Sequence, residues 1–211
     1  MAVTINDFSQ MSVGDIITLS DLQTQKEYDA LSADFKVKEV RFYDEPNGLF
    51  NHIAVICNYE NKDKGAEGQD QSIMVLARNF KTVNEFDIFV YYLDMEGEIS
   101  GAAEHILNED GQDLKNRIEV TVYFDDGEVD VTWDKKSLGT VFGVETSIFQ
   151  TEHREEVIQD NKTIVEYVTN DDMHGNQNAF IEWTGDSVDG WFELWYGCQI
   201  TPNDVELYDI K

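Results

Sequence analysis

Three tryptophans lie close together near the C-terminal end of this 211-residue chain. Trp183, Trp191 and Trp195 flank a polar stretch, residues 185–190, that is rich in Gly and Asp. Apolar residues alternate with polar ones on both sides of that stretch, which is the pattern of two half-buried strands joined by a turn. The sequence therefore predicts a β-hairpin that carries these aromatic side chains.

Closing this hairpin brings two carboxylates together. Thr184 then pairs with Trp191, and Glu182 lies opposite Glu193 on the same face. Glycoside hydrolysis uses one carboxylic acid with a raised pKa and one ionised carboxylate, with aromatic rings nearby to stack on sugars. One hypothesis is therefore a glycosidase-like, carboxylate-dependent hydrolase with Glu182 and Glu193 as its catalytic residues.

Binding without catalysis is the alternative that we favour, because like charges directly opposite each other destabilise a strand pair. Alternation predicts that Phe192, Leu194 and Tyr196 form the buried face of their strand. The opposite face would then be half exposed and could contact a ligand or partner. The predicted binding residues are Trp191, Trp195, Glu193, Trp183, Asp186 and Asp189.

Metal and cofactor sites are not predicted. The acidic stretch 170–176 offers Asp171, Asp172 and His174 as weak cation ligands, but it fails the EF-hand spacing because Ile181 occupies the position that requires Glu. No paired-cysteine motif for zinc is present, and we expect Cys57 and Cys198 to be free thiols.

The charge balance excludes some partners and favours others. The chain has 15 Lys and Arg against 43 Asp and Glu, a net charge of −28. Nucleic-acid backbones and anionic membranes both require basic surfaces, so neither is an expected direct partner. The stretch 163–210 contains no Lys or Arg. Solvation is the simplest explanation of the acidity; the alternatives are cation binding and recognition of a basic protein, including mimicry of DNA. If the protein acts by binding, the partner that we favour is a basic protein surface.

No secretory signal and no membrane-spanning helix are expected from the sequence. The first residues have no basic start, apolar run or cleavage site of a secretory signal. No stretch approaches the roughly 18 apolar residues of a membrane helix. We therefore expect a cytoplasmic protein.

Most of the chain shows the pattern of short strands. The clearest hairpin is predicted at 117–133, where apolar residues alternate on both sides of the turn at 125–127. A second hairpin joins 35–43 to 50–59 through an Asp-Glu-Pro-Asn-Gly turn. Further strands are expected at 16–19, 72–76, 86–93, 144–150, 163–168, 178–183, 191–196 and 205–208.

Helices are few in this pattern, with short ones expected at 6–11 and between Ser100 and Gly111. The two ends of the chain, 13–19 and 200–208, resemble edge strands of small SH3-type barrels. The predicted fold is mainly β or α+β, with antiparallel sheets or small barrel-like units. A single unit over 1–211 is favoured; the alternative is two β-rich subdomains, 1–97 and 115–211.

Overall fold

A computed structural model describes most of the chain. The described residues are 2–20, 33–59, 72–81, 85–98, 107–108, 114–124, 127–150, 154–168, 178–184 and 190–208. Within them lie one short helix and eleven strands. These are α1 (Ile5–Phe8), β1 (Ile16–Leu19), β2 (Ala33–Asp44), β3 (Asn51–Tyr59), β4 (Ser72–Phe80), β5 (Glu85–Glu98), β6 (Arg117–Phe124), β7 (Gly127–Gln150), β8 (Glu155–Val168), β9 (Asn178–Thr184), β10 (Trp191–Ile200) and β11 (Val205–Tyr208).

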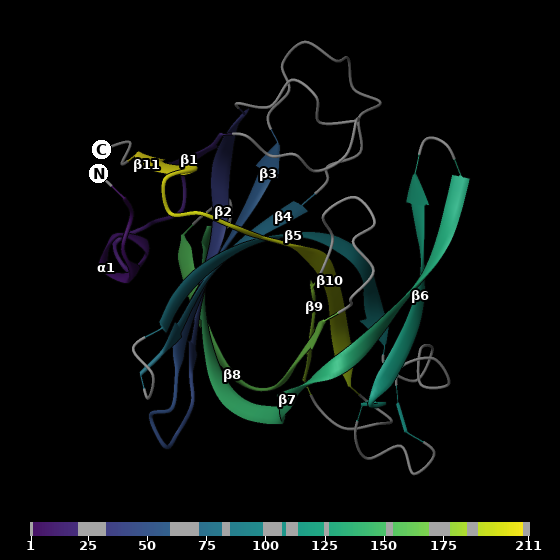
Figure 1. Ribbon diagram of the computed structural model, residues 1–211. Helices are drawn as coiled ribbons and strands as arrows, with labels where there is room; N and C mark the ends of the chain where they lie inside the picture. The colour runs from purple at the N-terminus through teal and green to yellow at the C-terminus, as the bar shows by residue number, and fades with distance from the viewer. Residues whose placement is uncertain are drawn as a thin grey trace.

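Eight of the strands close into an antiparallel barrel (Figure 1). The order around the barrel is β2-β3-β4-β5-β10-β9-β8-β7, and a second pairing of β7 with β2 completes the circle. The predicted β-rich, antiparallel fold with barrel-like character is therefore confirmed. The closing pair runs from Glu39 opposite Phe149 to Asp44 opposite Val144. Strands from both halves of the chain thus form the barrel wall.

The remaining elements lie outside this barrel. β1 and β11 pair with each other and extend the sheet beyond β2, beside α1. β6 pairs with the first part of β7, and this hairpin projects away from the barrel (Figure 1). In the described part of the chain, no helix has the length and apolar character needed to cross a membrane.

Side chains of the barrel strands are buried on both faces. One outer cluster packs α1, β1 and β11 against β2 to β5, and it includes Phe8, Phe35 and Val90. A second outer cluster contains Trp133 and Leu194 and covers β8, β9 and β10. A third cluster fills part of the interior with Tyr43, Phe50, Ala54, Ile56, Met74, Leu76, Phe89, Tyr91, Ile164, Phe180 and Trp195. Alternating residues of one strand therefore reach an outer cluster or the interior.

Local expectations compare well with the observed elements. A strand is found at each predicted position, and the strands predicted at 128–133 and 144–150 are parts of one long strand, β7. The helix predicted at 6–11 corresponds to α1. The other predicted helix lies largely outside the described residues, although Leu107 forms an isolated bridge with Leu114.

Candidate functional site

The predicted register of the β9–β10 hairpin is confirmed. Trp191 pairs with Thr184, and Glu193 pairs with Glu182. β10 also pairs with β5 on its other side, where Glu193 lies opposite Glu96. Three glutamates therefore form one row across three neighbouring strands.

The prediction that the strand face carrying Trp195 is half exposed is wrong for this residue. As predicted, Phe192 and Leu194 are buried, and they pack in the second outer cluster. The opposite face points into the barrel, so Trp195 is only 1% exposed and Glu182 only 1%. Alternation identified the two faces correctly, although Tyr196 of the predicted buried face is only partly buried. Closure of the barrel also buries Trp195 and Glu182 of the opposite face.

The other two tryptophans of the hairpin have different surroundings. Trp183 points outward and is buried in the second outer cluster. Trp191 lies at the start of β10 and is 48% exposed. The three tryptophans therefore do not form a single binding surface.

Arg41 of β2 is the centre of the buried charged site, which the sequence analysis did not identify. Its Nη1 donates to Oε1 of Glu182 at 2.5 Å and to Oε2 of Glu193 at 2.6 Å. Its Nε donates to Oε1 of Glu39 at 2.9 Å. A weak signal was present in the sequence, because Glu39, Arg41 and Tyr43 alternate along β2 and therefore share one face of this strand.

The hydrogen-bonding capacity of this guanidinium is fully used. Besides the three bonds above, Nη2 donates to Oε1 of Glu193 at 3.1 Å and to Oε2 of Glu39 at 3.3 Å. A guanidinium carries five N–H donors. All five donors of Arg41 therefore point at carboxylates of the protein itself.

The two paired glutamates differ in their titration. Burial raises the pKa of Glu182 to about 8, even though the positive charge of Arg41 opposes that shift. Its other oxygen, Oε2, accepts a hydrogen bond from the Tyr43 hydroxyl at 2.6 Å. Burial also raises the pKa of Glu193, but attraction to Arg41 and its hydrogen bonds outweigh burial, so the net pKa is lowered. At neutral pH Glu182 thus holds a proton and Glu193 is ionised.

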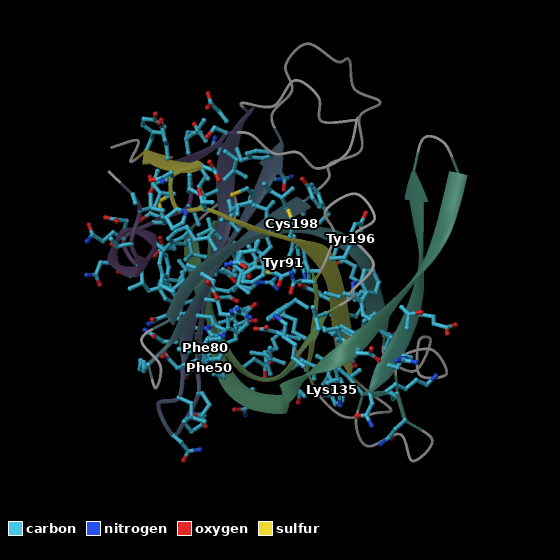
Figure 2. The ribbon with its side chains drawn as sticks, viewed as in Figure 1. Phe50, Phe80, Tyr91, Lys135, Tyr196 and Cys198 are labelled. Atoms are coloured by element: carbon cyan, nitrogen blue, oxygen red, sulfur yellow. The ribbon has the colours of Figure 1, made fainter. Side chains whose placement is uncertain are left out.

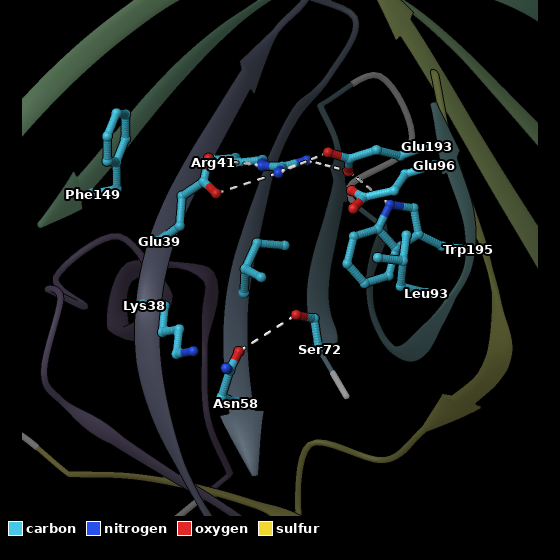
Figure 3. Close-up of a pocket in the computed structure, with 11 residues that line it drawn as sticks. Lys38, Glu39, Arg41, Asn58, Ser72, Leu93, Glu96, Phe149, Glu193 and Trp195 are labelled. Carbon is cyan, nitrogen blue, oxygen red and sulfur yellow. Dashed lines mark hydrogen bonds and ion pairs between the residues drawn. The ribbon is translucent and has the colours of Figure 1, made fainter. Parts of the chain in front are cut away.

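A cavity of about 470 Å³ lies beside this cluster (Figure 3). It extends from the exposed side chains of Lys38 and Glu96 to the buried Arg41 and Trp195. Trp195 Nε1 donates to Oε2 of Glu193 at 2.9 Å. The lining residues are Lys38, Glu39, Arg41, Ile56, Asn58, Ser72, Leu93, Glu96, Phe149, Glu193 and Trp195. Glu182, which is 1% exposed, is not among them.

A second buried ionic cluster lies elsewhere inside the barrel. Arg78 Nη1 is 2.6 Å from Oε2 of Glu166, and its Nη2 is 2.7 Å from Oδ2 of Asp87. Lys136 Nζ is 3.0 Å from the same oxygen of Glu166. The Arg78 guanidinium also lies over the ring of Phe89, at 4.6 Å. This cluster pairs its charges internally and fills the interior together with Phe50, Phe80 and Tyr91, which are labelled in Figure 2.

The remaining predicted site residues are outside this region. Asp186, Asp189 and the weak metal candidates Asp171, Asp172 and His174 lie outside the described residues. Among the residues that are described, no group of His, Cys, Asp and Glu could hold a metal ion. Cys57 is buried and Cys198 partly buried, and both are free thiols as expected.

Comparisons with models of known protein families, with curated proteins and with solved structures find no match to this chain.

Proposed function

We propose that the protein binds a small organic molecule in the cavity between Lys38 and Trp195. The observation that carries this proposal is the cavity itself, about 470 Å³ and open to solvent, with Arg41 and Trp195 of the barrel interior in its lining. Eight-stranded barrels are wide enough to hold one small ligand, and ligand sites of this size combine apolar walls with a few convergent polar groups. The lining contains both, with Ile56 and Leu93 among the apolar walls and Glu193 among the polar groups.

Binding accounts for the geometry better than hydrolysis by Glu182 and Glu193. Hydrolysis needs both carboxyl groups beside the bond that breaks. Only Glu193 lines the cavity, and both oxygens of Glu182 are engaged by Arg41 and Tyr43. Glu193 instead forms part of the buried end of the cavity, where Arg41 and Trp195 hold its carboxylate in place.

A substitution that fills the cavity tests this proposal. Ser72 lines the cavity, so Ser72→Trp should exclude a ligand, whereas Gln159→Trp places the same side chain at an exposed position of β8 that does not line it. Ligand-observed NMR would screen small fragments that carry an aromatic or alicyclic body and either an amine, an alcohol or a carboxylate.

We expect fragments to bind the wild-type protein and Gln159→Trp but not Ser72→Trp, with circular dichroism showing that all three are folded. Fragments that bind Ser72→Trp as well as the wild type would show that the cavity is not their site. Absence of binding in every fragment class would contradict the proposed function.

A basic protein partner is a second candidate, favoured by the exposure of Trp191. This ring is 48% exposed and lies between Thr184 and the exposed Glu98 in the sheet. Exposed tryptophans often provide much of the binding energy at protein interfaces, and surrounding carboxylates would attract a cationic surface. A partner of this kind should be lost in Trp191→Ala and at high salt. If Trp191→Ala still binds the partner at low salt, this candidate function is contradicted. The same result would count against a DNA-binding protein as the partner, to which the acidic surface would present itself as a mimic of DNA.

A further inference from the structure

We propose that the ligand is an organic cation, an ammonium group on an apolar body, with the ammonium held between Glu193 and Glu96. This inference rests on the proposed function, because it specifies which class of small molecule the same cavity accepts.

The first argument is the pairing of Glu193 with Glu96. These residues are direct partners in the β5–β10 pair, and both line the cavity. Arg41 compensates Glu193, but Glu96 has no hydrogen bond or ion pair with any residue that the structure describes. Like charges directly opposite each other destabilise a strand pair. A ligand ammonium at this position would neutralise them.

The second argument is the saturation of Arg41. An anionic ligand would need a free donor at the buried end of the cavity, and the guanidinium is the only cation that lines this end among the described residues. Its five donors are already directed at Glu39, Glu182 and Glu193. The buried end of the cavity therefore offers acceptors to a ligand and no cationic donor.

The third argument is the distribution of charge around the cavity. Figure 3 shows Glu193, Glu96 and Trp195 together on one side, with Lys38 on the opposite side. Each carboxylate oxygen can accept two hydrogen bonds, so Oε1 of Glu193, which accepts one from Arg41 at 3.1 Å, can accept another. The protein as a whole carries −28, and this field raises the local concentration of cations.

The apolar lining determines the rest of the ligand. Beside the two carboxylates lie Trp195 and Leu93, and Ile56 and Phe149 complete the apolar part of the lining. A fully hydrated inorganic cation would leave these surfaces in contact with water. An arylalkyl or cycloalkyl amine buries them and places its ammonium at the glutamates.

Matched ligands of different charge test this inference by isothermal titration calorimetry. The probes are tryptamine and 2-phenylethylamine, each compared with the alcohol and the carboxylate of the same ring. We expect the amines to bind at least about tenfold more tightly than the alcohols, because a hydrogen bond to a charged group contributes that much or more. The carboxylates should bind most weakly.

Variants on one strand identify the carboxylate. Glu96→Gln should weaken amine binding about tenfold and leave alcohol binding unchanged. Glu98→Gln, two residues along β5 and outside the cavity lining, is the control and should bind as the wild type does. If alcohols or carboxylates bind as tightly as the amines, or if Glu96→Gln has no effect on amine binding, the ligand is not an organic cation. The proposal that the cavity binds a small molecule would still hold. If no probe of any charge binds, both proposals fail.

Discussion

Replacing Glu182 by Gln tests the assignment of a buried proton inside the barrel. The side chain is 1% exposed, and burial raises its pKa from 4.5 to about 8. In an unfolded chain the same carboxyl ionises near 4.5, so between these pH values the folded protein binds one more proton than the unfolded chain.

The sign and size of the effect follow from this difference. A group with a raised pKa makes the free energy of unfolding fall as pH rises, by about 1.4 kcal/mol per pH unit. The fall begins near the unfolded pKa of 4.5 and ends near the folded pKa of about 8. Between about pH 5 and about pH 8, Glu182 therefore lowers the stability by roughly 4 kcal/mol.

The Glu182→Gln variant removes this dependence with little change in shape. Its carbonyl can accept the hydrogen bond from Arg41, and its amide can donate to the Tyr43 oxygen. Urea denaturation, followed by tryptophan fluorescence at several pH values, gives the free energy of unfolding of each protein. We expect the wild type to lose about 4 kcal/mol relative to the variant from about pH 5 to about pH 8.

Two controls make the result decisive. Glu98→Gln removes an exposed carboxyl of β5 and controls for the loss of one glutamate charge outside the cluster. A constant difference between Glu182→Gln and the wild type would refute the assignment of the proton. If Glu193→Gln removes the pH dependence instead, the proton is held by the other member of the pair.

Two further substitutions test the packing and the second buried titratable group. At Gly197 a Cβ would lie 1.9 Å from the backbone oxygen of Val90, so Gly197→Ala should lower the melting temperature strongly or prevent folding, whereas Gly48→Asn, in a turn with φ of 75°, should be tolerated. Equal melting temperatures for these two variants would contradict this account. Burial lowers the pKa of His52 from 6.5 to about 4, so stability should fall as pH drops through that range, by at most about 1.4 kcal/mol per pH unit. His52→Phe leaves the Asn79 amide without its acceptor but should abolish this fall in stability. Urea denaturation at several pH values measures the free energy of unfolding of both proteins. If this free energy depends on pH in the same way in the variant and the wild type, His52 is not the group responsible.

The hairpin that carries Glu182 and Glu193 shows what the local sequence pattern can predict. A turn-forming stretch between two alternating segments was enough to predict that Thr184 pairs with Trp191 and that the two glutamates face each other. This prediction needs only the period of two along a strand and the length of the connecting loop. The same reasoning identified Phe192 as part of a buried face.

The contacts of Arg41 could not be predicted from the local sequence pattern. Arg41 is 141 residues from Glu182 and 152 from Glu193 in the sequence, and nothing in either neighbourhood indicates the other. The contact exists because β2 pairs with β7 and closes the barrel, which places β2 across the interior from β9 and β10. Alternation places Glu39, Arg41 and Tyr43 on one face of β2, but it does not identify the residues that they face.

The sequence by itself determined the acidic charge, the strand positions, the antiparallel character of the hairpins and the pairing of Glu182 with Glu193. Only the tertiary structure decided that Trp195 is buried, that one arginine holds both glutamates, and that a cavity lies beside them. Alternation assigns side chains to two faces of a strand, and that is a local property of the backbone. Which face becomes an interior depends on whether distant strands pair to close the sheet, and in this protein the β2–β7 pair makes that difference.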